Sequence, residues 1–108
     1  MRKSAGFFAA LALLFSVSAL ADQPLVIDVR TAEEYRQGHV RDALNIPYGE
    51  IASRIAALIP DRDTSIVLYC RSGRRAGVAE HALRQLGYGR IENRGGLDDM
   101  QRGGYSIQ

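Results

Sequence analysis

Apolar and polar residues alternate along the chain in short blocks that predict strands and helices in turn. Residues 25–29 and 66–69 are β-branched apolar runs, typical of buried strands in a parallel sheet. Weaker strands are expected over 43–46, before a proline, and over 90–93. A last helical turn is expected over 97–100. The sequence therefore predicts four strands separated by segments that can form helices.

Three of those segments show helical signals. Thr31 and Glu34 match a capping box, so a short helix should start there and end at Gly38. Two longer helices are expected over 51–59 and 76–86, where apolar residues recur on one face. The apolar stripes consist of Ile51, Ile55, Leu58 and Ile59 in the first, and of Ala76, Ala79, Leu83 and Leu86 in the second. The alternation predicts an α/β domain of three layers, a mostly parallel sheet flanked by helices.

Residues 1–21 differ from the rest of the chain and match a signal peptide. Arg2 and Lys3 precede an apolar run over 5–17, and the small residues Ala19 and Ala21 suit cleavage by signal peptidase after position 21. The apolar run is shorter than the roughly 20 residues of a membrane span. We expect secretion, no stable membrane anchor after cleavage, and a single domain over 22–108. A buried N-terminal helix is the alternative.

Removal of this leader changes the charge. The 108 residues carry 14 basic and 12 acidic side chains, a formal charge of +2, which alone would suit a nucleic-acid partner. Two of the basic residues lie in the leader, so the predicted mature domain is formally neutral and no nucleic-acid partner is expected. The chain has one Cys and two His; we expect His39 to be structural and His81 exposed. These residues predict no disulfide, no metal site and no cofactor.

The candidate chemistry lies where the strand at 66–69 meets the helix at 76–86. Cys70 follows the strand directly, at the sheet edge where open parallel sheets bind ligands. The next five residues form the predicted loop and the predicted binding site for substrate: Arg71, Ser72, Gly73, Arg74 and Arg75. Amides of a loop that leads into a helix can bind an anion. The same positive field, together with the arginines, should lower the thiol pKa and make Cys70 a nucleophile for an anionic substrate.

Each of these residues also has a plainer interpretation. A lone Cys is commonly a small buried hydrophobe, although three nearby arginines argue against burial because their charges would be desolvated too. Arg75 could pair with a neighbouring carboxylate instead of facing substrate. Arg71 and Arg74 could be solvated loop charges.

At these residues the sequence resembles the rhodanese domain family. The loop matches the pattern Cys-x-x-Gly-x-Arg at Cys70, Gly73 and Arg75. The other matching segments are, in chain order, Ile27-Asp28-Val29-Arg30, Glu33 with Tyr35, Gly38-His39-Val40, Ala43-Leu44-Asn45-Ile46-Pro47 and Gly95-Gly96-Leu97. The resemblance spans nearly all of residues 25–100, in the right order.

The resemblance implies a thiosulfate sulfurtransferase of the periplasm. The Cys70 thiolate would take the outer sulfur of thiosulfate as a persulfide and pass it to cyanide or a thiol. The amides of 71–75 and the Arg75 guanidinium would stabilise the anions. Asp28 and Arg30 would brace the loop, or form a purely structural turn and ion pair.

Two other functions stay open. A thiolate-based phosphatase or arsenate reductase has one more residue between its Cys and Arg, which would require Arg at position 76, where this chain has Ala76. A non-catalytic sulfur carrier or redox sensor would need the same reactive Cys70. The sequence does not separate that module from an enzyme.

Overall fold

The computed structural model describes residues 23–108, so the predicted signal peptide over 1–21 lies outside the described residues. The elements are, in chain order, β1 (Leu25–Asp28), α2 (Ala32–Gln37), β2 (Leu44–Asn45), α3 (Ile51–Leu58), β3 (Ile66–Cys70), α4 (Arg74–Gln85), β4 (Ile91–Gly96) and α5 (Leu97–Arg102). Among residues 23–108 no helix has the length and apolar character needed to cross a membrane. The predicted alternation of strands and helices is confirmed.

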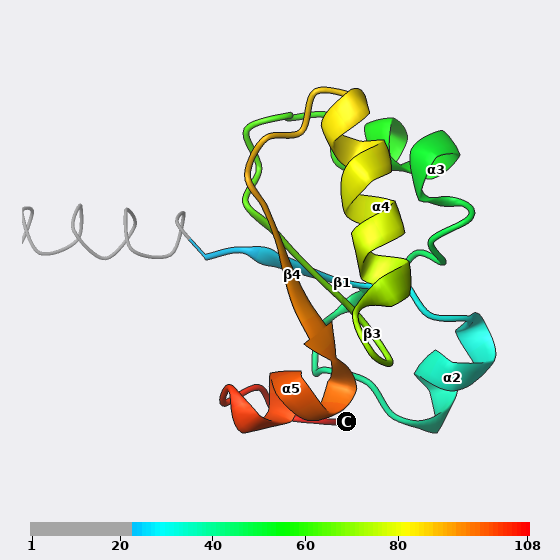
Figure 1. Cartoon of the computed structure of the whole chain (residues 1–108), viewed down its shortest axis with the longest axis vertical. Helices are drawn as coiled ribbons and strands as arrows, with labels where there is room; N and C mark the ends of the chain where they lie inside the picture. Colours follow the sequence, from blue (N-terminus) through cyan, green and yellow to red (C-terminus); the bar gives the residue numbers. More distant parts are fainter. Residues whose placement is uncertain (1–22) are drawn as a thin grey trace, which may run out of the picture.

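The four strands form one parallel sheet in the order β2-β1-β3-β4. Helices α3 and α4 cover one face, while α5 and the C-terminal segment pack on the other (Figure 1). The three-layer α/β prediction is therefore confirmed. The C-terminal segment is held by an isolated antiparallel bridge between Val40 and Ile107. Because the sheet is parallel, the C-terminal ends of β1 and β3 lie at one edge, which positions the candidate site.

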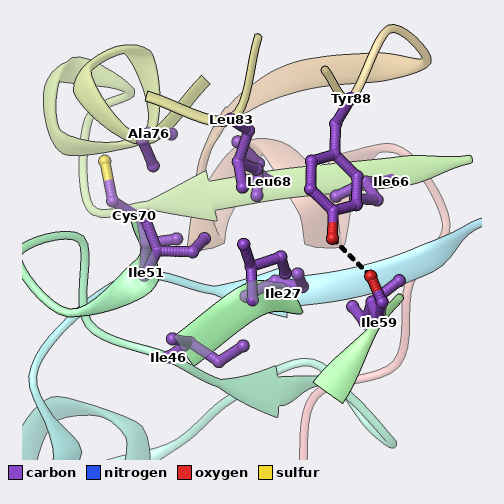
Figure 2. Packing of buried hydrophobic residues seen from close by; sticks show 13 residues of the cluster. Ile27, Ile46, Ile51, Ile59, Ile66, Leu68, Cys70, Ala76, Leu83 and Tyr88 are labelled. Carbon is purple, nitrogen blue, oxygen red and sulfur yellow. Dashed lines mark hydrogen bonds between the residues drawn. The ribbon is translucent and has the colours of Figure 1, made fainter. Parts of the chain in front are cut away.

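The central strand β3 decides which way the Cys70 side chain points. All five of its residues are buried, and successive side chains of a strand face opposite sides of the sheet. Ile66 and Leu68 join the core beneath α3 and α4, and Cys70 follows in the same row (Figure 2). Val67 and Tyr69 join the smaller core on the α5 side. The alternation of side chains along β3 thus places the Cys70 thiol on the sheet face that α4 covers.

The short helix α2 follows its sequence signal closely. The Thr31 hydroxyl accepts a hydrogen bond from the Glu34 N–H, and the Glu34 carboxylate accepts one from the Thr31 N–H in return. Gly38 caps the other end at φ +151°. The predicted capping box and helix stop are confirmed, although α2 buries none of its own residues.

Several element boundaries differ from the prediction. Strand β2 has only two of the four expected residues, because Ala43 closes a turn onto Val40 and Pro47 has no N–H to continue the ladder. Leu58 and Leu86 are exposed rather than buried, because each stands where its helix ends and the chain turns away. The last strand is longer than expected and runs to the second glycine of its Gly-Gly pair.

Candidate active site

Cys70 lies at the C-terminal end of β3, beneath the start of α4. Its Sγ accepts a hydrogen bond from the Gly73 N–H at 3.0 Å, and it packs in a cluster with Ala76 and Ile51 (Figure 2). The residue is only 1% exposed. The expectation that nearby arginines would prevent burial is wrong, because Arg71 and Arg74 lie exposed at the surface while the strand turns the thiol inward.

Backbone amides control the ionisation of this thiol. Burial alone would raise the pKa of Cys70, but the N–H groups of Ala76, Ser72, Gly73 and Arg75 outweigh it and hold the pKa below its ordinary value. The prediction of a lowered thiol pKa agrees with this direction. Its expected cause is corrected in part, since hydrogen bonds from the main chain are the causes that lower the pKa of Cys70, with the Arg75 guanidinium adding a Coulombic attraction.

The loop after Cys70 is shorter than the sequence suggested. Only Arg71, Ser72 and Gly73 lie outside regular structure, and α4 starts at Arg74. Gly73 is the N-cap of α4 at φ +100°, a left-handed conformation that favours glycine. The amides of the loop and of the first helical turn therefore converge on one sulfur atom. This arrangement suits an anion at the helix N-terminus.

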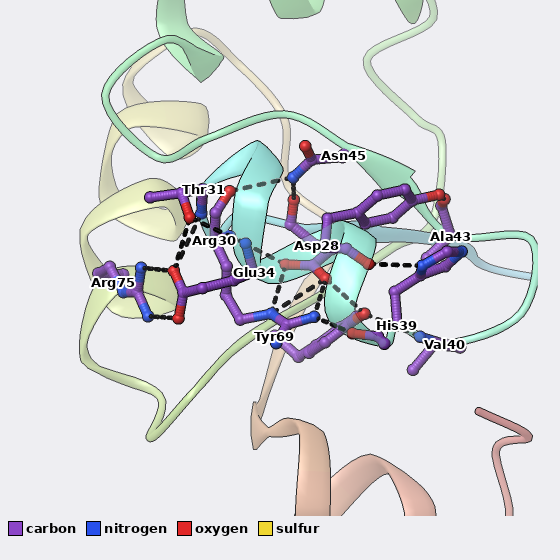
Figure 3. Close-up of polar contacts among 12 residues, drawn as sticks. Asp28, Arg30, Thr31, Glu34, His39, Val40, Ala43, Asn45, Tyr69 and Arg75 are labelled. Atoms are coloured by element: carbon purple, nitrogen blue, oxygen red, sulfur yellow. Dashed lines mark hydrogen bonds and ion pairs between the residues drawn. The ribbon is translucent and has the colours of Figure 1, made fainter. Parts of the chain in front are cut away.

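Arg75 forms an ion pair instead of pointing freely at the thiol. Its Nη1 and Nη2 donate to the two carboxylate oxygens of Glu34 at 2.7 and 3.0 Å (Figure 3). This bidentate contact lowers the pKa of Glu34 to about 2, with the Arg75 hydrogen bonds as the largest cause. The alternative interpretation of Arg75, a salt bridge to a neighbouring carboxylate, is the one that the structure shows. Its backbone N–H donates to the Cys70 sulfur, and its guanidinium charge also attracts the Cys70 thiolate.

Asp28 and Arg30 form a buried network at the end of β1. The Asp28 carboxylate accepts from Arg30 Nε and Nη2, and from the Tyr69 hydroxyl at 2.7 Å (Figure 3). Arg30 also donates to the Gly38 carbonyl, and the Val40 N–H donates to the Tyr69 hydroxyl. Neither Asp28 nor Arg30 contacts Cys70 through a hydrogen bond. The pair braces Tyr69, the residue before Cys70, and so reaches the loop only through the backbone.

The two histidines match their expected roles. The His39 ring stacks on the Tyr35 ring at a centroid distance of 3.7 Å, and its Nδ1 lies 2.8 Å from the Tyr35 carbonyl oxygen. His81 is exposed on α4.

A cavity of about 340 Å³ opens beside the Cys70 loop. Its lining residues are Arg30, Glu34, Gln37, Arg71, Leu97 and Asp98. Arg71 and Leu97 place the cavity close to Cys70, because they directly follow Cys70 and Gly96, which are partners in the sheet. Within residues 23–108, no carboxylate lies within ion-pair distance of Arg71 or Arg74. These two side chains are therefore available to an anion.

The end of β4 closes against the loop from the other side. A Cβ on Gly96 would stand 2.0 Å from the carbonyl oxygen of Arg71, so any side chain there would collide with the loop backbone. The Asn93 side chain bridges Gly73 and Gly95 through two hydrogen bonds of 2.9 Å each. Strand β4 thus supports the loop by direct contact.

The comparisons with known proteins agree with this arrangement. The family model described as the Rhodanese-like domain matches residues 16–102, which is most of the chain. The chain belongs to the rhodanese-like domain family. The resemblance predicted from the sequence is confirmed.

Relatives within the rhodanese-like family cover nearly the same length. Thiosulfate sulfurtransferase PspE of Escherichia coli K12 is 45% identical over 91 residues, which are 84% of this chain and 86% of the relative. A sulfurtransferase of Allochromatium vinosum is 44% identical over 84 residues, 77% of each chain. A solved E. coli structure, described as a rhodanese with anions, superposes with a TM-score of 0.73 at 40% identity, over 80% of this chain and 98% of that one.

Sequence reasoning missed two side chains of this rhodanese-like site. Glu34 was expected only to cap α2, and the family pattern drew attention to Glu33 instead, which is exposed. Asn93 was expected only as a strand residue. Each acts on a segment at least 20 residues away. The Gly-Gly pair after Asn93 was the one local signal that the backbone there comes close to another segment.

Proposed function

We propose that this protein is a thiosulfate sulfurtransferase that carries sulfur as a persulfide on Cys70. The observation that carries the proposal is the buried Cys70 Sγ at the end of β3, hydrogen-bonded by the Gly73 N–H and surrounded by the first amides of α4. A thiol whose pKa is lowered by main-chain donors is a nucleophile at neutral pH. The E. coli relative is named a thiosulfate sulfurtransferase and the A. vinosum relative a sulfurtransferase, and both names support this class of activity.

The first half-reaction transfers one sulfur atom. The Cys70 thiolate attacks the outer sulfur of thiosulfate, the sulfur–sulfur bond of thiosulfate breaks, and sulfite leaves with the electron pair. A persulfide anion remains on Cys70, so the total charge is conserved. The amides that stabilise the thiolate also stabilise the terminal sulfur of this anion.

The second half-reaction regenerates the thiolate. Cyanide attacks the terminal sulfur of the persulfide and leaves as thiocyanate, with the bonding electrons returned to the Cys70 sulfur. A thiolate acceptor reacts in the same way and leaves as its own persulfide. Both half-reactions use only sulfur nucleophiles or cyanide, and they require no cofactor.

The exposed arginines explain how an anionic donor reaches the buried thiol. Arg71 lines the cavity beside the loop, and Arg74 lies at the first position of α4. Their charges raise the local concentration of a small dianion. The sulfonate of thiosulfate binds at the Arg71 and Arg74 side chains. Its outer sulfur then lies beside Cys70 Sγ, among the N–H groups of Ser72 and Gly73. Asp28 and Arg30 support the site by fixing Tyr69.

Two alternatives predict different products. A phosphatase would need a wider loop to surround a phosphate group. This loop has only three residues between Cys70 and the start of α4. A sulfur carrier would form the same persulfide but release it only to a partner protein. Neither has a structural feature that favours it over the transferase.

The cell compartment follows from the leader. We infer that residues 1–21 direct secretion and are removed, so that the domain works in the periplasm. A protein with a single Cys keeps its thiol free of intrachain disulfides in that oxidising compartment.

The test is steady-state turnover of thiosulfate and cyanide, with thiocyanate and sulfite measured, beside turnover of an aryl phosphate. We expect thiocyanate and sulfite in equal amounts, no phosphate release, and no activity in Cys70→Ser. Phosphate release without thiocyanate would replace the proposal by a phosphatase. Persulfide formation without turnover by cyanide or small thiols would replace it by a carrier.

A further inference from the structure

The side chain of Asn93 connects β4 to the Cys70 loop. Its Nδ2 donates to the carbonyl oxygen of Gly73, and its Oδ1 accepts from the N–H of Gly95, each at 2.9 Å. Both glycines have left-handed backbone, with φ of +100° and +86°. A single side-chain amide therefore joins two glycines whose backbone conformation favours glycine.

Gly73 links Asn93 to the nucleophile. The N–H of Gly73 donates to Cys70 Sγ at 3.0 Å, while its carbonyl oxygen accepts from Asn93 and from the N–H of Gly77. Glycine has no Cβ to restrict its φ and ψ, so the residue itself does not fix the direction of its N–H. The two hydrogen bonds to its carbonyl anchor the peptide unit of Gly73 and Arg74 to β4 and α4, which limits how far Gly73 can move away from Cys70 Sγ.

The irregularity of β4 lies at this contact. Leu68 of β3 pairs with Asn93, whereas Cys70 pairs with Gly96, so the register shifts between them. Two residues of β4 then oppose Tyr69 alone. A bulge of this kind bends its strand and re-aims neighbouring side chains. Asn93 is the last residue of β4 before the register shift. Its Oδ1 accepts a hydrogen bond from the N–H of Gly95, which lies in the bulge.

We propose that Asn93 is a positioning residue for the Cys70 nucleophile, because its side-chain amide holds Gly73 with the N–H directed at the sulfur. It acts through Gly73 and contacts no reacting atom. The inference rests on the proposed function in one respect, namely that the Cys70 thiolate is the reactive group. It is independent of the sulfur donor and acceptor.

The consequence is measurable on the thiol itself. Without Asn93, Gly73 samples other conformations and its N–H leaves the sulfur for part of the time. The loss of one hydrogen bond to a thiolate should raise the alkylation midpoint of Cys70 by about half a unit to one pH unit. At a pH well below both midpoints this corresponds to roughly three- to tenfold slower alkylation. Turnover with thiosulfate should fall in kcat/KM to a similar extent.

The experiment compares the pH dependence of iodoacetamide alkylation in the parent chain and in Asn93→Ala and Asn93→Asp. Cys70 is the only Cys, so alkylation reports on it alone. Asn93→Asp keeps the acceptor for Gly95 but loses the donor to Gly73, and it is nearly isosteric. The control is Arg62→Ala, which removes side-chain hydrogen bonds to the carbonyls of Leu86 and Pro60 near the far end of α4.

We expect the midpoint to rise in both Asn93 variants and to stay at the parent value in Arg62→Ala, even where the control lowers thermal stability. An unchanged midpoint in the Asn93 variants, or an equal rise in the control, would overturn the proposal. If Asn93→Ala does not fold, the comparison of Asn93→Asp with the parent decides, made at high salt so that the charge of the added carboxylate is screened. A parent chain inactive with thiosulfate would contradict the proposed function, but the midpoints would still test the role of Asn93.

Discussion

Glu34 and Arg75 lie 41 residues apart in sequence and meet through two hydrogen bonds of 2.7 and 3.0 Å. The contact joins α2 to the first turn of α4, where the amides that hold Cys70 begin. Both side chains are only partly exposed. The pair therefore fixes the start of α4, whose N–H groups surround the Cys70 sulfur. It also neutralises the Arg75 guanidinium, which does not act as an unpaired cation.

A double-mutant cycle measures this contact. Glu34→Gln keeps a residue that can form the capping box with Thr31, so it removes the ion pair with little damage to α2. With Arg75→Gln as the second change, we expect a coupling free energy of about 1 kcal/mol, the upper end for partly exposed pairs because the geometry is bidentate. Chemical denaturation of the four proteins gives the value. Strictly additive losses would show that the pair does not hold α4.

The same contact predicts how stability responds to acid. The pKa of Glu34 is lowered to about 2 by Arg75, from an ordinary value of 4.5. A carboxyl with a depressed pKa stabilises the fold fully above its unfolded value and loses that contribution as pH falls through the folded value. We expect part of the stability to disappear between pH 4.5 and 2. Denaturation of Glu34→Gln over this range should show a shallower decline; an identical slope in parent and variant would contradict the assignment.

Tyr69→Phe tests whether the buried network is structural. The hydroxyl donates to Asp28 and accepts from the Val40 N–H, so its removal leaves a buried donor unpaired. We expect a loss of about 1–3 kcal/mol in the free energy of unfolding with an unchanged alkylation midpoint of Cys70. Tyr48→Phe, at a half-exposed ring, should change stability by no more than about 0.5 kcal/mol. A stable Tyr69→Phe protein with slow sulfur transfer would instead give the network a direct part in catalysis.

Gly96→Ala tests the contact between β4 and the loop. The new methyl group would lie 2.0 Å from the Arg71 carbonyl oxygen, and the neighbour is backbone that cannot rotate away. We expect a loss of stability of about 1–3 kcal/mol or more and slower sulfur transfer, because the loop must shift. Gly89→Ala is the matched control, since nothing lies within 4 Å of its added Cβ. Equal thermal unfolding midpoints for the two variants would refute the close approach.

The sequence predicted the fold well because its signals are local. The apolar runs at β1 and β3, the capping box of Thr31 and Glu34, and the stripe on α4 each depend on residues a few positions apart. The position of Cys70 at a strand end was predictable for the same reason. Its burial was not, because the pleat of β3 decides which way the side chain faces and the charges of its neighbours do not.

The contacts that position the loop depend on the tertiary fold. Glu34 approaches Arg75, and Asn93 approaches Gly73, only after a parallel sheet has placed α2 and β4 on either side of α4. The amides around the thiol belong to no particular residue type, so no motif shows which of them will donate. The arginines drew attention in the sequence, whereas burial raises the pKa of Cys70 and main-chain N–H groups lower it.

The central claim, that Cys70 takes a sulfur atom from thiosulfate, is tested most directly by intact-mass spectrometry. The parent chain and Cys70→Ser are incubated with thiosulfate without an acceptor, and released sulfite is measured in parallel. We expect the parent to gain the mass of one sulfur atom with one equivalent of sulfite, and to lose that mass when cyanide is added. Cys70→Ser should gain nothing. A parent that gains no sulfur, or a Cys70→Ser variant that gains it, would contradict the account.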